Sequence, residues 1–336
     1  MRQLHLLPFA LCLLLFACDN TLNTVSGYTD TPIVYGFLSN NDTAVYIRVE
    51  RAFVDANKPS SQIAQLPDSL YYSDAVVTLT RVKTNEKFTL QRVDGNKEGY
   101  LRDPGYFATA PNYLYKSQKI TFTPNEAWRI DVFRGTNTKA LATATTNVVG
   151  NYDDYSPTTN TLSPTLDNNI SFGIQTDEVT GKDFDVNLNF VYDETTTTAP
   201  IKTTTKTAVW QFASGSVRQN GSGNIPSPYI IFGRTGKDFY QFLSDKIPAA
   251  VAVTRTFKRI DFEIYAGGQE FINYSTAGIS NTGITGFQPL ATYTNITGGL
   301  GIFSSRTKYT RSNLILNDPA LNLLKTSDLT KQLNFR

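Results

Sequence analysis

The sequence has almost none of the side chains on which nucleophilic enzymes and zinc enzymes depend. Its 336 residues include one histidine, one methionine and two cysteines, and His5, Met1 and Cys12 all lie in the segment that ends at Ala17. If that segment is a removable leader, the rest of the chain contains no histidine and one cysteine, Cys18. Ser-His-Asp and Cys-His catalysis, zinc sites of histidine and cysteine, and internal disulfides are then excluded. Stability must come from packing, and a chain of this length suffices for two domains.

The chain also lacks a charge pattern that would attract nucleic acid. Lysine and arginine number 31 against 29 aspartates and glutamates, so the formal net charge is +2, and no basic run stands out. We therefore expect no nucleic-acid partner. The apolar run at the N-terminus, Leu6 to Ala17, is interrupted by Pro8 and has twelve residues, whereas a membrane-spanning helix needs about 20.

That short run is typical of a signal peptide, and it ends in a motif of its own. Leu15-Phe16-Ala17-Cys18 resembles the lipobox of bacterial lipoproteins, in which the cysteine becomes the first mature residue and is acylated. We predict a lipoprotein signal peptide over residues 1–17 and lipidation of Cys18, palmitate included. The alternative is a plain signal peptide with an unmodified cysteine. Each methylene of an acyl chain that is buried in the bilayer contributes about 0.8 kcal/mol to membrane binding.

Residues 18–31 are predicted to be the lipidated cysteine and a polar tether. The stretch that follows Cys18, Asp19 to Thr31, could hold the first domain up to ~45 Å from a bilayer. This predicts a protein anchored to the outer membrane, on its periplasmic or its surface face.

The mature sequence alternates apolar and polar residues almost throughout, which is the period of half-buried strands. In "TAVYIRVERAF", Val45, Ile47 and Val49 alternate with polar or amphipathic side chains. Seven or eight such segments lie between Pro32 and Thr146, separated by turn residues. We predict an immunoglobulin-like β-sandwich over residues 32–149, although the cysteines and tryptophan of antibody domains are missing.

A polar stretch, residues 150–169, is predicted to be a linker, and residues 170–336 a second β-rich domain with one or two short helices. Alternation resumes in "FDVNLNFVY", residues 184–192, and "EFINYS", residues 270–275, is expected to be a strand after a hairpin turn at Gly267-Gly268. One helix is predicted in "GKDFYQFLSDKIP", residues 236–248, with Asp238 as cap. Another is expected to start at Asp318-Pro319. The fold class is therefore all-β.

Three motifs resemble chemical sites but have simpler interpretations. "GRTGKD", residues 233–238, lacks the first glycine and the Ser/Thr of a phosphate-binding loop, so we interpret it as a strand-to-helix turn. "DGNKEG", residues 94–99, lacks the glutamate that closes a calcium loop, and we expect a hairpin turn. Calcium at a cluster such as residues 167–169 stays an open alternative. Asp261 and Glu263 share a strand face ~7 Å apart, a spacing that suits an inverting glycosidase, but an amphipathic strand shows the same pattern.

Glycines gather near the C-terminus in "TNITGGLGIFSS", residues 294–305. Glycine reaches positive φ without steric cost, and a tight turn or bulge before a buried strand needs such a residue. We predict a structural turn in which Gly298, Gly299 or Gly301 adopts a glycine-only conformation. Leu300, Ile302 and Phe303 are expected to pack in the core of the second domain.

Several of these segments together resemble the DUF4249 lipoproteins of Bacteroidota, a family defined as a domain of unknown function. The matching segments are "FACDN" at residues 16–20, "IVYGFL" at 33–38, "LYYSDAVVTLTR" at 70–81, "GNKEGYL" at 95–101, "ALATATT" at 140–146 and "YTNITGGLGIFSS" at 293–305. The resemblance implies an architecture and a location in the cell envelope, and it implies no chemistry. Members of that family look like accessory proteins near TonB-dependent transporters of the outer membrane.

The sequence thus predicts a non-enzymatic cell-envelope lipoprotein that acts in binding or assembly, without cofactor or metal. Its expected partners are the membrane, through the lipid anchor, and an outer-membrane transporter. The alternative is a carbohydrate-active or carboxylate-based hydrolase of the cell surface. Aromatic residues make up 12% of the chain and could line a glycan platform, but aromatics at strand spacing usually form cores.

Overall fold

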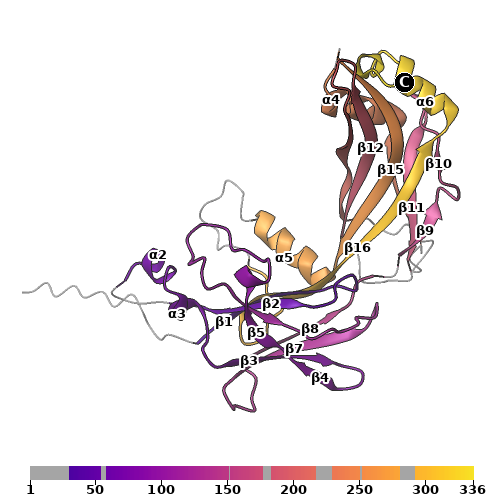
Figure 1. Cartoon of the computed structure of the whole chain (residues 1–336). Coiled ribbons are helices and arrows are strands. Elements are labelled where there is room, and N and C mark those ends of the chain that lie inside the picture. Colours follow the sequence, from indigo (N-terminus) through magenta and orange to yellow (C-terminus); the bar gives the residue numbers. More distant parts are fainter. Residues whose placement is uncertain are drawn as a thin grey trace, which may run out of the picture.

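The chain folds into two β-rich lobes that are joined by one long strand (Figure 1). The structure, a computed structural model, describes residues 30–53, 58–150, 152–176, 183–216, 229–249, 252–280 and 292–336. Strands dominate and the helices are short, which confirms the predicted all-β class. The predicted signal peptide and Cys18 lie outside the described residues.

The N-terminal lobe is a sandwich of two sheets. Its strands are β1 (Pro32–Leu38), β2 (Tyr46–Arg51), β3 (Ala75–Arg81), β4 (Glu86–Thr89), β5 (Gln91–Asp94), β6 (Tyr113–Lys116), β7 (Ala127–Arg134) and β8 (Ala142–Asn147). One sheet has the order β1-β2-β6-β5 and the other β4-β3-β7-β8. If the strands are lettered A to G in chain order, with β4 as C′, the two sheets have the orders A-B-E-D and C′-C-F-G. This is the immunoglobulin arrangement. The predicted immunoglobulin-like sandwich is confirmed.

The core of this lobe follows from the alternation of its strands. Val77 and Leu79 on β3 face Val132 and Ile130 on β7, and all four side chains are buried. Trp128 is fully buried at the centre of this core, where its ring contacts those of Phe88 and Phe122. Alternate positions of the same strands point outward, because successive side chains of a strand lie on opposite faces.

Two insertions extend the lobe at one end. Short helices α2 (Ser60–Ile63) and α3 (Pro67–Leu70) lie between β2 and β3. Between β5 and β6 lies a long loop, residues 95–112, which we call the β5–β6 excursion. It starts with the 3₁₀ helix η2 (Gly95–Lys97). The expected hairpin turn at residues 94–99 is therefore wrong, because Asp94 accepts backbone N–H groups from both Asn96 and Asn112 and closes a wider loop.

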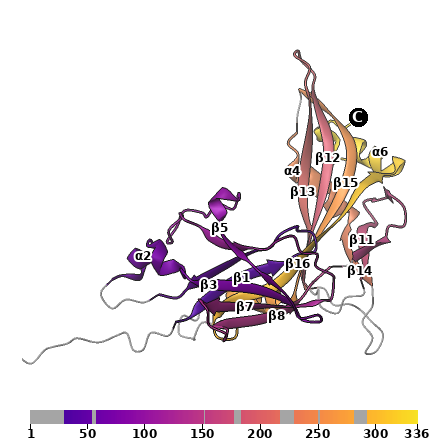
Figure 2. The same ribbon diagram turned by 60° about the horizontal axis from the view of Figure 1, so that its bottom comes forward.

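A strand from the C-terminal part of the chain completes this lobe. β16 (Leu300–Leu316) pairs in parallel with β1 over residues 300–305, so the sheet gains a fifth strand at its β1 edge. Just before it, Thr297 bridges β8 of the opposite sheet. Figure 2, which views the lobe from below, has β16 beside β1. The segment therefore closes the open side of the sandwich between its two sheets.

This placement corrects one sequence-based expectation. Ile296 and Phe303 are buried in the N-terminal core, not in the core of the second lobe, and Leu300 is 46% exposed. The predicted glycine-only conformation is present at Gly298 (φ 81°) and Gly301 (φ 98°). Gly299 has no positive φ, but a Cβ there would lie 2.6 Å from the carbonyl oxygen of Pro32.

The second lobe packs a four-stranded antiparallel sheet against a three-stranded one. Its strands are β9 (Tyr152–Ser156), β10 (Thr161–Leu162), β11 (Asn169–Thr176), β12 (Asp183–Thr196), β13 (Thr203–Ser216), β14 (Tyr229–Thr235), β15 (Val253–Gly267) and the second half of β16. The sheet orders are β13-β12-β15-β16 and β14-β11-β9. Phe172 of β11 stacks on Phe262 of β15 at 4.7 Å between ring centroids, in the core between the sheets.

The predicted linker is not a plain connection. Within residues 150–169, β9 pairs with β11 and β10 pairs with β16. Tyr152 and Leu162 are buried in the second core, so most of this polar stretch belongs to the second lobe. The exposed residues between these two anchors account for its polar composition.

Two helices cover the far end of the second lobe. α4 (Gly236–Lys246) follows β14 directly, as expected for the turn at residues 233–238, and its cap is Thr235, not Asp238. α6 (Asp318–Thr326) begins with Pro319 in its first turn, capped by Asn317, and η3 (Lys331–Leu333) follows it. No helix of the described residues is long and apolar enough to cross a membrane.

A third helix replaces the strand that is expected after Gly267-Gly268. α5 (Gln269–Ser280) lies in the angle between the lobes, over β16 and the β1 edge (Figure 1). Glu270 in its first turn accepts hydrogen bonds from Thr146 of β8 and Ser304 of β16. The predicted strand over residues 270–275 is thus wrong, because contacts to the N-terminal lobe stabilise a helix at this position.

Candidate functional site

The outer face of strands β1 and β2 carries a groove lined by aromatic side chains. On β1, Val34 and Leu38 point into the core, so Tyr35 and Phe37 point outward. Helix α5 stands along one side of these rings. Three neighbouring cavities share Tyr35 or Phe37 as lining residues, and we call them together the aromatic groove.

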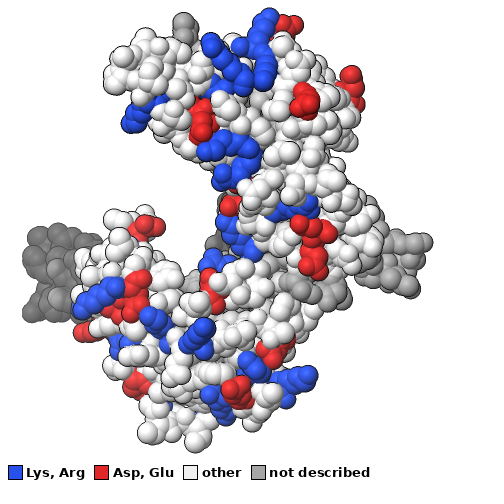
Figure 3. Space-filling model, turned by 45° about the vertical axis from the view of Figure 1, so that its right-hand side comes forward, with Lys and Arg blue, Asp and Glu red and all other residues white. Residues whose placement is uncertain are grey.

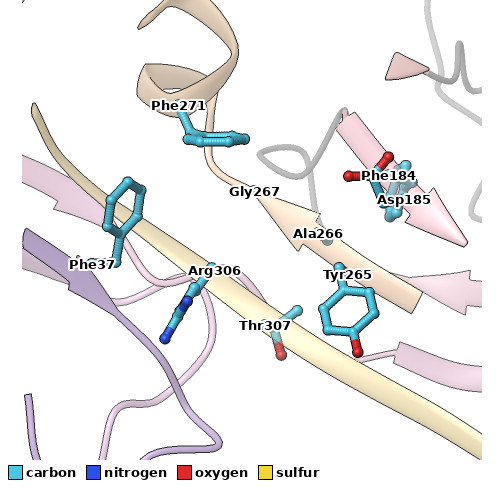
Figure 4. A pocket seen from close by; sticks show the side chains of 9 residues that line it. All are labelled: Phe37, Phe184, Asp185, Tyr265, Ala266, Gly267, Phe271, Arg306 and Thr307. Atoms are coloured by element: carbon cyan, nitrogen blue, oxygen red, sulfur yellow. The ribbon is translucent and has the colours of Figure 1, made fainter. Parts of the chain in front are cut away.

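One end of the groove is a cavity where the two lobes meet. This cavity has a volume of about 350 Å³ and is lined by residues of both lobes. Figure 4 shows Phe37 of β1 and Phe271 of α5 on one side, Tyr265 of β15 on the other, and Arg306 and Thr307 of β16 between them. Because β16 belongs to both sheets, one strand fixes the two walls relative to each other.

Helix α5 is held on the groove by aromatic pairs. Phe271 meets Phe37 edge to face at 5.8 Å between ring centroids, and Tyr274 meets Tyr35 in the same geometry at 6.5 Å. Such pairs contribute roughly 0.5–1.5 kcal/mol beyond area burial. Burial, and then the hydrogen bond with Tyr274, raise the pKa of Tyr35 to about 12. Its phenol is therefore neutral at physiological pH.

A second cavity of about 330 Å³ continues the groove across β2. Tyr46 packs on Tyr100 at 4.4 Å between ring centroids, and the neighbouring Leu101 is 77% exposed. Exposed apolar side chains that cluster in this way are typical of interaction sites. Tyr100 and Leu101 come from the β5–β6 excursion, so that insertion forms the far wall of the groove.

A cluster of three charged side chains stands beside the groove. Arg48 and Arg102 both donate to one oxygen of the buried Glu50, at 3.1 and 2.7 Å. This pair of bonds ties the β5–β6 excursion to β2. Removal of one partner of a buried charge pair costs far more than an exposed pair contributes.

The outward face of the second lobe is polar. Arg259 bonds both oxygens of Asp261, which also accepts the backbone N–H of Asn313. Lys308 lies 2.7 Å from Glu263 and holds the pKa of that carboxyl below its usual range. Figure 3 shows an open hollow between the lobes, with lysine and arginine side chains gathered along its inner wall.

The carboxylates that could have suited a glycosidase do not form an acid–base pair. A general acid needs a raised pKa, whereas the ion pair with Lys308 lowers that of Glu263. Asp261 is only 9% exposed and accepts hydrogen bonds from Arg259 and from the backbone N–H of Asn313. Both residues therefore organise the sheet face.

The other sequence candidates have structural roles. Asn168 donates to the carbonyl of Ser163 and accepts the N–H of Thr165, so it closes a turn. Among the described residues, no group of three or more His, Cys, Asp or Glu side chains is placed to hold a metal ion. Cys18 lies outside the described residues.

Sequence reasoning does not find the aromatic groove. The sequence feature that could have indicated the groove is the alternation of Ile33, Tyr35 and Phe37 with the buried residues of β1. This alternation puts three apolar side chains on an outward face. Helix α5, which packs against these rings, is predicted as a strand. It is also far from β1 in the sequence, since β1 begins at Pro32 and α5 at Gln269.

Comparisons with known proteins add no functional information. No protein-family model matches this chain, and no curated protein matches it. Two solved structures that are similar to it are the CBD12 region of CALX1.2 and the FN1–FN3 domains of chicken CNTN1. They are 9% and 8% identical to it, with TM-scores of 0.20 and 0.18. The alignments cover 83% of this chain and 100% of the first structure, and 84% of this chain and 67% of the second. Scores this low support no argument.

Proposed function

We propose that this chain is a lipid-anchored protein of the cell envelope that binds a partner protein through the aromatic groove. The observation that carries the proposal is the groove at the lobe junction, with Phe37, Tyr265 and Phe271 on its walls. Aromatic residues and arginine are enriched in protein–protein interfaces and supply most of their hot spots. The LFAC motif at Cys18 supports attachment to the outer membrane.

The geometry of the rings favours a protein over a glycan. A sugar ring needs an open aromatic face on which to stack, whereas Phe37 and Tyr35 pack edge to face against α5. The cavity at the lobe junction has a mixed lining of these rings with Arg306 and Thr307, which suits side chains of a polypeptide. By resemblance to the DUF4249 lipoproteins, an outer-membrane TonB-dependent transporter is the candidate partner. Hydrolysis is the less favoured alternative, because Glu263 and Asp261 are held in ion pairs.

The anchor is tested by replacing the predicted acylation site. Cys18→Ser should release the protein from the membrane fraction, and its unfolding transition should stay where it is, because the tether precedes both lobes. Continued membrane association of Cys18→Ser would contradict the lipoprotein part of the proposal.

The groove is tested by crosslinking in intact envelopes. Phe37→Ala with Phe271→Ala should lose the crosslink to an outer-membrane protein that the native chain forms. The matched control is Ile231→Ala, since Ile231 is an exposed apolar residue of β14 outside the groove. Circular dichroism should first establish that both variants fold. An identical crosslink in the groove variant would exclude the groove as the binding site.

A further inference from the structure

Another, smaller pocket lies in the N-terminal lobe beside α3, outside the aromatic groove. Its volume is about 220 Å³, and three arginines from three different strands line it: Arg51 of β2, Arg92 of β5 and Arg134 of β7. Tyr72 and Tyr113 complete its walls. A pocket of this size is below the roughly 300–1,000 Å³ of sites for drug-sized ligands, so it suits one small chemical group.

Two of the three guanidinium groups have no carboxylate partner among the described residues. Arg134 forms ion pairs with Asp30 and Asp74, both at 2.7 Å. Arg51 donates only to the carbonyl oxygen of Ser69, and Arg92 only to that of Ser73, at the outer limit of 3.5 Å. Asp68, an exposed residue of α3, also lines the pocket. Asp30 and Asp74 are both paired with Arg134, so Arg51 and Arg92 present guanidinium groups to the pocket that no carboxylate of the described residues pairs.

Arg92 is also fixed in place before any ligand arrives. Its guanidinium lies over the ring of Tyr113 at 3.6 Å from the centroid. Its Nε is buried and has no hydrogen-bond partner in the described part of the chain. Stacking reduces the side-chain freedom that binding would otherwise remove.

We infer that this pocket binds a phosphate group. A carboxylate has two oxygens in one plane, and a single guanidinium fork satisfies both. Arg51 and Arg92 come from separate strands, and a tetrahedral phosphate can accept from both at once. The source of the phosphate is either a lipid headgroup or a free phosphate ion.

The position of the pocket favours a headgroup. Asp30, which pairs with Arg134 and accepts a hydrogen bond from Tyr72, is the first described residue and lies at the end of the predicted tether. If Cys18 is acylated, the pocket lies at the end of the lobe from which the anchor extends. This step alone rests on the proposed function, whereas phosphate binding as such does not depend on lipidation.

Calorimetric titration of the full chain carrying Cys18→Ser tests the inference. The probes are inorganic phosphate, acetate, and the soluble short-chain lipids dioctanoyl phosphatidic acid and dioctanoyl phosphatidylcholine. Phosphate should bind, and Arg51→Gln or Arg92→Gln should raise its Kd at least tenfold. The matched control is Lys87→Gln, which removes an exposed positive charge on β4 and should leave the Kd unchanged.

The outcomes separate the alternatives. Tighter binding of phosphatidic acid than of inorganic phosphate supports the lipid source, and equal binding supports the free ion. Failure of inorganic phosphate and phosphatidic acid alike to bind would overturn the inference. So would acetate binding as tightly as phosphate, or a Kd that Arg51→Gln and Arg92→Gln leave unchanged in variants with native circular dichroism.

Discussion

Thr143 and Thr297 exchange two backbone hydrogen bonds, at 3.0 and 2.8 Å, although they lie in distant parts of the sequence. This bridge joins the edge strand β8 to the segment that then pairs with β1. Both sheets of the N-terminal sandwich are therefore completed by residues 297–305. The lobe depends on the C-terminal part of the chain for its stability.

The first prediction concerns Gly301. A Cβ there would overlap the carbonyl oxygen of Val34, and φ is positive, so Gly301→Ala should reduce the free energy of unfolding by about 1–3 kcal/mol. Urea unfolding measures this. Gly278→Ala in α5 is the matched control, since a Cβ there meets nothing within 4 Å. It should leave stability unchanged or raise it by up to about 1 kcal/mol. Equal effects of the two substitutions would contradict the close pairing of β16 with β1.

The second prediction is a pH dependence at Glu263. Lys308 lowers the pKa of this carboxyl in the folded protein. Its contribution is therefore fully present above the unfolded pKa of about 4.3 and is lost as the pH falls through the lower folded value. Glu263→Gln should be less stable than the native chain at pH 7 and equal to it at pH 2. Urea midpoints at several pH values measure the difference in stability between the two proteins. A difference that did not change with pH would refute the stabilising ion pair between Glu263 and Lys308.

The third prediction concerns a buried ion pair in the second lobe. Arg255 is 1% exposed, lies 2.8 Å from Glu194 and donates to the carbonyl of Leu333. Arg255→Ala leaves Glu194 with only the partly exposed Lys206 as a cation and removes the donor to the Leu333 carbonyl, and it should cost about 3 kcal/mol of unfolding free energy. Lys331→Ala, which removes an exposed partner of Asp328, should cause no measurable change. Similar denaturant midpoints for the two variants would contradict the prediction.

The fourth prediction is that the lobes do not move independently. β16 pairs with β1 through residue 305 and with β15 from residue 306, so no loop separates them. Spin labels at Lys87→Cys and Lys325→Cys, in a chain whose cysteines are serines, should give one narrow distance distribution. Insertion of Gly-Gly-Ser between Ser305 and Arg306 should broaden it. A broad distribution without the insertion would exclude a rigid junction.

Strands such as β1 and β8 of the N-terminal sandwich can be predicted because their side chains alternate between a buried and a more exposed face. The pairing of β16 with β1 cannot, since a register between Ile33 and Leu300 leaves no local pattern. The helix α5 escapes prediction for a related reason. Gly267-Gly268 followed by Phe271 and Ile272 has the composition of a turn and a strand, and long-range contacts decide otherwise.

The same limit applies to the candidate site. Outward-facing Tyr35 and Phe37 cannot be told from core residues until it is known which sheet face α5 covers. The sequence does identify Asp261 and Glu263 as neighbours on one strand face. Their cations, Arg259 and Lys308, become partners through strand geometry, and Lys308 comes from a different strand.

The late position of residues 297–305 has a consequence for biosynthesis. A polypeptide that emerges N-terminus first exposes β1 to β8 long before its C-terminal segment arrives, so the β1 edge stays open during most of translation. Unpaired edges promote aggregation, and contacts of such long range slow folding. Premature termination anywhere before residue 300 would leave both lobes unfinished together. Only chains that include residues 300–305 can therefore pair the β1 edge.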